Sequence, residues 1–203
     1  MKDWTNLADK NTIEETIKSL KPRGINAFFV ETGQDAKEKV LQLLPKGSRV
    51  LAGQSQTLNK IGITDEIENS GNFVSVGKEY MAFDREKEAD KIRIARSTPD
   101  VIVGSVHAVT KQGEVLIASN TGSQLASYVS GAGKVIWVVG TQKIVEDLNE
   151  GIKRIYDYVL DLESQRLEKL YGVKSNVSKL LIFNKEVAPQ RVTLIFVNEL
   201  LGF

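Results

Sequence analysis

The sequence of 203 residues contains no cysteine and only one histidine. The absence of cysteine excludes disulfides, a catalytic thiolate, Cys-ligated zinc and Cys-ligated iron–sulfur clusters in this chain. Because His107 is the only histidine, a multi-histidine metal site is excluded as well. We therefore expect no metal site and no intrinsic cofactor, so a redox centre would have to belong to a partner chain.

A strong net charge and a long apolar run are also missing. The 27 Lys and Arg residues nearly balance the 26 Asp and Glu residues, and the formal net charge of +1 gives no sign of nucleic-acid binding. No stretch reaches the apolar length that spans a bilayer, and the N-terminus lacks the apolar core of a signal peptide. These features predict a cytoplasmic protein that binds neither nucleic acid nor membrane. No helix-turn-helix pattern supports a ligand-sensing DNA-binding regulator.

Two short apolar runs are present, and both are typical of buried strands. Val101–Val103 and Val135–Val139 have no alternating polar positions, which favours strands of a parallel sheet that is covered on both faces. Earlier in the chain, strand patterns at 25–31 and 48–52 are each followed by a helical pattern. This order predicts a three-layer α/β/α, Rossmann-like fold with a mainly parallel sheet.

An antiparallel part completes the predicted fold. Residues 108–118 alternate about Lys111-Gln112-Gly113, which indicates a hairpin. Lys179–Phe183 and Arg191–Val197 are expected to be two last strands that pair at an edge of the sheet. The length of the chain and its four prolines favour one domain, residues 1–203, in which residues 1–24 form a peripheral N-terminal helix.

Small polar residues follow the expected strands. In open α/β sheets, ligands bind outside the carboxyl ends of the strands, where backbone N–H groups and hydroxyls can hold an anion. We therefore predict a site for a small anionic metabolite that is formed by Gly53, Gln54, Ser55, Thr57, Ser105, Asn120, Gly122, Ser123, Gln124, Gly140, Thr141 and Lys143.

Three ionisable residues at these loops are candidates for specific roles. The ammonium of Lys143 could neutralise a bound anion, and the alternative is a surface lysine near the start of a helix. His107 and Glu199 are the candidate catalytic residues, because either side chain could move a proton. The alternatives are a histidine held by local hydrogen bonds and a carboxylate that faces solvent.

Two nucleotide-binding motifs are incomplete in the sequence. Residues 130–134 (SGAGK) match the end of a P-loop, but Tyr128 stands where the motif requires glycine and Val135 where it requires Ser or Thr. The dinucleotide pattern Gly-x-Gly-x-x-Gly fails because Ile136 occupies its last position. Both motifs are therefore rejected.

Five motifs occur in one order along the chain. They are residues 53–58 (GQSQTL) with Gly62, 105–110 (SVHAVT) with Gly113, 138–145 (VVGTQKIV), 152–155 (IKRI) and 198–203 (NELLGF). In this order they resemble the LUD-domain family of lactate-utilisation proteins over roughly Gly53 to Phe203. The resemblance implies the fold shared by ribose-5-phosphate isomerase, glucosamine-6-phosphate deaminase and CoA transferases. It also implies a role in lactate or organic-acid utilisation, with a sugar phosphate, a hydroxy or keto acid, or a CoA ester as the ligand, and a homo-oligomer by analogy.

The chain departs from this family pattern at several positions. Many relatives carry acidic residues in place of Lys111 and Gln112 and near Ser119, and Asn-Arg in place of Ser123-Gln124. Many also carry a cysteine-rich segment that this chain lacks. Two hypotheses stay open: an enzyme, or its close derivative, that binds an anionic metabolite, and a non-catalytic accessory subunit of an oxidative complex whose redox centres lie on partner subunits.

Overall fold

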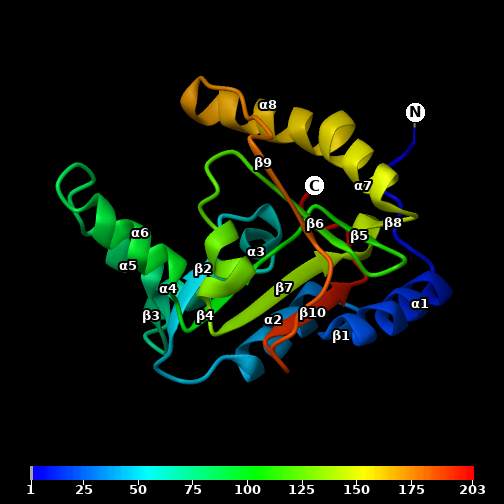
Figure 1. The fold of residues 1–203 in the computed structure, drawn as a ribbon, viewed down its shortest axis with the longest axis horizontal. Helices are drawn as coiled ribbons and strands as arrows, with labels where there is room; N and C mark the ends of the chain where they lie inside the picture. The colour runs from blue at the N-terminus through cyan, green and yellow to red at the C-terminus, as the bar shows by residue number, and fades with distance from the viewer. Residues whose placement is uncertain (1) are drawn as a thin grey trace.

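The computed structural model describes residues 2–203 and contains a six-stranded sheet in which every neighbouring pair of strands is parallel. In spatial order the strands are β1 (Ile25–Val30), β10 (Val192–Val197), β7 (Lys134–Gly140), β4 (Val101–Gly104), β2 (Arg49–Ala52) and β3 (Val74–Ser75). All their carboxyl ends therefore lie at one edge of this main sheet (Figure 1). Strand β4 is buried throughout, and β7 is buried from Val135 on, which confirms the prediction of buried parallel strands.

Helices cover both faces of the main sheet. On one face, apolar side chains of α2 (Gly33–Leu43), α3 (Gln56–Lys60) and α4 (Ile63–Asn69) form a core with the outward-facing residues of β2, β4 and β7. On the other face, α1 (Lys10–Leu20), α5 (Val76–Met81), α6 (Ala89–Ser97) and the π turn η2 (Ser127–Gly131) contribute to a second core around Trp137. The chain therefore has the predicted three-layer α/β/α architecture.

The N-terminal helix predicted for residues 1–24 is shorter in the structure. Its first residue is Lys10, because the Asp9 side chain accepts a hydrogen bond from the Thr12 N–H and caps the helix. A short 3₁₀ turn, η1 (Lys21–Arg23), follows α1. Leu20 is fully buried in the core, so the end of this helix packs against the sheet. Met1 lies outside the described residues, and the single-domain assignment stays a prediction.

A second, four-stranded sheet lies between the main sheet and the long helix near the C-terminus. Its strands are, in spatial order, β8 (Ile144–Val145), β5 (Ala108–Thr110), β6 (Val115–Ser119) and β9 (Lys179–Phe183). Val109 and Ile117 join the core shared with the main sheet, whereas Ala108 and Leu116 face a third apolar cluster with Ile155. The predicted hairpin is thus present, as β5 and β6, but it belongs to this smaller sheet.

The last two strands do not pair with each other. β9 pairs antiparallel with β6 in the smaller sheet, whereas β10 lies between β1 and β7 in the main sheet. The prediction that they share an edge is therefore wrong. The reason is visible in their burial: all six residues of β10 are buried, as a central parallel strand requires, whereas β9 is fully buried only at Phe183.

One long helical segment covers the outer face of the smaller sheet (Figure 1). It consists of α7 (Leu148–Arg154), the π turn η4 (Ile155–Val159) and α8 (Leu160–Tyr171). It begins where the Asp147 side chain accepts a hydrogen bond from the Glu150 N–H, and it ends at Gly172, whose φ of +70° suits glycine.

Candidate functional site

Three of the predicted loop residues meet at the carboxyl edge of the main sheet. Lys143 belongs to the 3₁₀ turn η3 (Thr141–Lys143) that follows β7, and its Nζ lies 3.3 Å from Thr57 Oγ1 and 3.2 Å from Ser105 Oγ. A third contact joins Nζ to the carbonyl oxygen of Val106 at 3.1 Å. Because β7, β4 and β2 are neighbours in the sheet, the loops that follow them converge on one amine.

The segment 198–203 covers this amine from outside. Thr57 Oγ1 donates a hydrogen bond to the Leu201 carbonyl at 3.1 Å, and Gln142 Nε2 donates to the same oxygen at 3.0 Å. Gly140 permits the close approach, because a Cβ at this position would lie only 2.6 Å from the Glu199 carbonyl oxygen. As a result, Lys143 is only 2% exposed, so the alternative of a surface lysine does not hold.

The environment of Lys143 disfavours its charged form. Burial lowers the pKa of Lys143 well below its ordinary value, and the positive charge of Arg154 lowers it further. Within residues 2–203, no carboxylate forms an ion pair with this amine. The side chain is therefore less basic than an ordinary lysine, and its expected role in neutralising an anion stays a prediction.

Arg154 is the cation of this region, and the sequence patterns did not single it out as a site residue. It is fully buried at the end of α7, where Nη1 donates to the His107 carbonyl at 2.6 Å and the guanidinium lies 5.4 Å from the Tyr158 ring. Its Nε and Nη2 atoms have no hydrogen-bond partner in the described part of the chain. Burial lowers the pKa of Arg154 to about 10, so the side chain stays charged at neutral pH.

His107 lies in the connection from β4 to β5. Lys143 contacts the Val106 carbonyl in this connection, and Arg154 contacts the His107 carbonyl. Its Nδ1 accepts a hydrogen bond from the Ala118 N–H at 3.0 Å, which places the proton of the neutral ring on Nε2. Burial lowers the pKa of His107 to about 3, and the positive charges of Lys143 and Arg154 act in the same direction. The ring is therefore neutral and locally hydrogen-bonded, and its role as an acid or base stays a prediction.

The carboxylate of Glu199 points to the start of α2 rather than to Lys143. Its Oε1 accepts a hydrogen bond from the Gly33 N–H at 2.9 Å, one of the free donors at the first turn of this helix. No hydrogen bond in the range 2–203 joins Glu199 to the lysine. Its catalytic role also stays a prediction.

The predicted loop 120–124 lies at the end of the smaller sheet. The Ser178 hydroxyl donates to Asn120 Oδ1 at 2.9 Å, the Gly122 N–H donates to Ser119 Oγ at 2.9 Å, and Ser123 Oγ donates to Gln124 Oε1 at 2.9 Å. None of the hydrogen bonds between described residues connects this loop to Lys143. The hydrogen bonds therefore do not link this loop to the lysine cluster, and its part in an anion site stays a prediction.

The remaining predicted residues surround the cluster without touching Nζ. The Gly53 N–H donates to the Val103 carbonyl at 2.8 Å and extends the pairing of β2 with β4. Gln54 is exposed, and Ser55 precedes α3 without a side-chain capping bond. Thr141 Oγ1 is buried and has no hydrogen-bond partner in residues 2–203.

An open depression of about 590 Å³ borders the lysine cluster. It is lined by Gln56, Asn59, Lys60, Leu200, Gly202 and Phe203, so α3 forms one wall and the segment 200–203 the other. Gly202 connects the depression to the amine, because a Cβ at Gly202 would lie 3.5 Å from Lys143 Nζ and 2.6 Å from Thr57 Oγ1. The GQSQTL and NELLGF motifs border this depression, but Gln56, Asn59 and Lys60 were not predicted as site residues.

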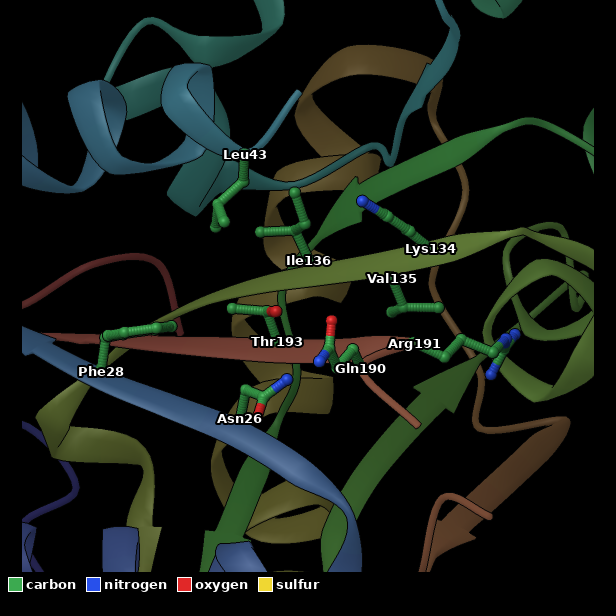
Figure 2. A pocket seen from close by; sticks show the side chains of 9 residues that line it. All are labelled: Asn26, Phe28, Leu43, Lys134, Val135, Ile136, Gln190, Arg191 and Thr193. Carbon is green, nitrogen blue, oxygen red and sulfur yellow. The ribbon is translucent and has the colours of Figure 1, made fainter. Parts of the chain in front are cut away.

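A smaller cavity of about 150 Å³ lies at the opposite, amino edge of the main sheet. Figure 2 shows its lining, which comes from β1, β7, β10, the residues before β10 and the end of α2: Asn26, Phe28, Leu43, Lys134, Val135, Ile136, Gln190, Arg191 and Thr193. No residue of the predicted site lies there. The cavity is therefore separate from the lysine cluster.

The described residues contain neither a cluster of metal ligands nor a membrane-spanning helix. No group of three or more His, Cys, Asp or Glu side chains within 2–203 is placed to hold a metal ion. None of the helices in this range combines the length and apolarity needed to cross a bilayer. The candidate site is thus built from hydroxyls, amides, carbonyl oxygens and basic side chains.

Comparisons with known proteins place the chain in a family. Among solved structures it is similar to a DUF162 family protein from Deinococcus radiodurans, with a TM-score of 0.57, 13% identity, and coverage of 95% of this chain and 100% of that chain. At this identity the likeness shows the fold alone. A second structure, eIF2B delta from Chaetomium thermophilum, matches with a TM-score of 0.34 at 15% identity over 71% of this chain and 57% of that chain, which is too low to support an argument. No curated protein matches the sequence.

A family model matches most of the sequence. The model described as the LUD domain matches residues 13–197. This range includes Thr57, Ser105 and Lys143, which meet at the carboxyl edge, and also Arg154. The chain belongs to the LUD domain family.

Proposed function

We propose that the protein binds a small anionic metabolite in the depression between α3 and the segment 200–203. The observation that carries this proposal is the composition of the walls. Lys60 supplies a cation, Gln56 and Asn59 supply amide donors, and none of the described residues that line the depression is acidic. Ligands of α/β proteins bind at this edge of a parallel sheet, so the position agrees with the chemistry.

Buried positive charge behind the depression favours the same class of ligand. Arg154 stays protonated, has two unpartnered nitrogen atoms and forms no ion pair with a carboxylate in the described residues. An uncompensated charge in a buried position is unfavourable, and a nearby anion relieves part of that penalty. The field of Arg154 therefore attracts an anion towards the carboxyl edge.

The size of the depression and the family resemblance narrow the choice of ligand. A volume of about 590 Å³ accommodates a hydroxy acid, a keto acid or a sugar phosphate. The resemblance to lactate-utilisation proteins favours hydroxy and keto acids among these. Lactate and pyruvate are therefore the first ligands to test.

Titration calorimetry and thermal unfolding with lactate, pyruvate and inorganic phosphate test the proposal. At a free ligand concentration of 100 times Kd, the native state should gain about 2.7 kcal/mol. Lys60→Ala should weaken binding about fivefold, because an exposed charge contact contributes up to about 1 kcal/mol. Lys169→Ala, which removes an exposed lysine from α8, is the matched control and should bind as the unmodified protein does.

Two results would contradict the proposal. One is that none of the anions stabilises the protein or releases measurable heat. The other is that Lys169→Ala weakens binding as much as Lys60→Ala, which would indicate a general response to surface charge rather than a site.

A further inference from the structure

We infer that the cavity at the amino edge of the main sheet binds an uncharged, single-ring heterocycle that carries a hydrogen-bond donor next to an acceptor, as a pyrimidine base does. This cavity is separate from the depression at the carboxyl edge, so the inference does not depend on the function proposed there. The supporting observations are unused hydrogen-bonding groups in the cavity, a strained turn that borders it and apolar walls.

Asn26 and Thr193 place two polar side chains next to each other in the cavity. They are register partners in β1 and β10, so their side chains lie on the same face of the main sheet. Thr193 is only 9% exposed and is the one polar residue of β10. Its hydroxyl takes part in none of the side-chain hydrogen bonds within residues 2–203. Because a buried hydroxyl normally has a partner, this one is available to a molecule in the cavity.

Gln190 adds a second carboxamide to that of Asn26. Figure 2 shows the two amides and the Thr193 hydroxyl grouped together in the cavity. Neither amide takes part in a side-chain hydrogen bond in the described part of the chain. A carboxamide presents a C=O acceptor and an NH₂ donor in one plane, and it pairs with a base edge on which a donor and an acceptor are neighbours.

The backbone at Gln190 is in a conformation that costs stability. This residue follows Pro189 in a turn that is closed by the Arg191 N–H, which donates to the Ala188 carbonyl at 3.4 Å. Its φ is +59°, and among residues 2–203 it is the only residue other than glycine with a positive φ. Glycine is favoured at such a turn position. A strained side chain at the rim of a cavity is typical of a residue that contacts a ligand.

The rest of the lining fits an uncharged ring. Phe28, Leu43 and Ile136 form apolar walls, and none of the described lining residues is acidic. A cavity of about 150 Å³ holds one six-membered ring. The nitrogens of the Arg191 guanidinium are all engaged in hydrogen bonds, and Figure 2 shows the Lys134 ammonium apart from the two amides. Shape and polarity therefore favour a neutral heterocycle over an anion.

NMR of the unmodified full chain tests the inference with cytosine as the probe. Cytosine has an amino donor next to a ring-nitrogen acceptor, and 2-pyrimidinone is the matched control because it has the same ring without the amino group. We expect cytosine to shift the side-chain amide signals of Asn26 and Gln190 and to leave the amide of Gln165, an exposed residue of α8, unchanged. The control should bind about fivefold more weakly, which is the effect of one lost hydrogen bond.

Two variants connect the binding to the cavity. Thr193→Val removes the hydroxyl from a buried position and should weaken cytosine binding about fivefold. Gln190→Gly removes an amide and also relieves the turn, so it should raise Tm by about 2–4 °C while it weakens cytosine binding about fivefold. Gln165→Ala removes an exposed carboxamide outside the cavity and should bind cytosine as the unmodified protein does.

The outcomes also separate this inference from the proposed function. Cytosine that shifts neither the Asn26 nor the Gln190 amide overturns the inference, as does 2-pyrimidinone that binds as tightly as cytosine. Unchanged binding in both Thr193→Val and Gln190→Gly overturns it as well. Displacement of cytosine by lactate or phosphate would place the base at the carboxyl edge and also contradict it. Binding that is weakened by both cavity variants and resists these anions supports the inference, whether or not the depression binds an anion.

Discussion

Two arginines at opposite edges of the main sheet show how differently this chain treats a buried charge. At the amino edge, Arg191 pairs with Glu186 at 2.6 Å, and its other nitrogens donate to the carbonyl oxygens of Ala132, Ser127 and Tyr128 at 3.0 Å. At the carboxyl edge, Arg154 has one carbonyl partner and no acidic partner among the described residues.

The difference separates a structural cation from a cation that is available to a ligand. Every nitrogen of the Arg191 guanidinium is bound, so the nearby cavity of about 150 Å³ in Figure 2 has little to offer an anion. Arg154 instead has two nitrogens without a hydrogen-bond partner in residues 2–203, and its third nitrogen donates to the His107 carbonyl, next to the Val106 carbonyl that Lys143 contacts. The carboxyl edge is thus positive and incompletely satisfied, which is typical of functional sites.

The largest expected effect is the loss of stability when Arg191 is replaced. Arg191→Met leaves the buried Glu186 carboxylate without its partner, which destabilises the fold by about 3–5 kcal/mol in urea unfolding. Arg166→Met removes a more exposed ion pair with Glu163 and is the control, with an expected loss below about 1 kcal/mol. Equal effects of the two variants would show that burial of the Arg191 pair does not matter.

The next largest effect is a pH dependence of the free energy of unfolding, which arises from His107 at the carboxyl edge. The pKa of His107 is about 3 in the native state and about 6.5 when unfolded, so below pH 6.5 the unfolded chain binds a proton that the native ring does not. This contribution to stability is present above pH 6.5 and is lost towards pH 3, at up to about 1.4 kcal/mol per pH unit.

Unfolding of the unmodified protein and His107→Gln between pH 7 and pH 4 measures this contribution. The unmodified protein should lose stability more steeply than His107→Gln, which has no titrating ring. Parallel pH profiles would mean that His107 titrates normally in the native state and that its surroundings are not as dry as the structure indicates.

The smallest expected effect concerns Arg154 itself. In Arg154→Met, the lost hydrogen bond to the His107 carbonyl is offset by removal of an unpaired buried charge. We expect the free energy of unfolding without ligand to change by less than about 1 kcal/mol, whereas pyruvate binding weakens. A loss as large as that of Arg191→Met would make Arg154 a structural residue and remove it from the site.

The main sheet was predictable because its strands carry a local signal. Val101–Val103 and Val135–Val139 are apolar without interruption, and only a strand covered on both faces buries such a run. The same rule applied to Val192–Val197 would have placed this strand at the centre of the sheet, where β10 lies. The error arose from assuming that consecutive strands pair.

The site was only partly predictable because its chemistry comes from contacts that are distant in sequence. The charge state of Lys143 depends on burial against Thr57 and Ser105, which are 86 and 38 residues away. The sequence did contain a signal that Arg154 is buried. It stands next to Ile155, on the helix face that packs against the smaller sheet. The redox partner subunits, the homo-oligomer and the cytoplasmic location stay predictions.

The charge state of Lys143 at neutral pH is the central quantity, and carbon NMR of the lysine Cε positions measures it directly. The Lys143 signal is assigned by its loss in Lys143→Arg and followed from pH 5 to pH 11 beside the signals of exposed lysines. We predict that the Lys143 signal titrates at a lower pH than the signals of the exposed lysines, whose pKa is about 10.4. A Lys143 signal that titrates together with the exposed lysines would contradict the burial of this amine at the carboxyl edge.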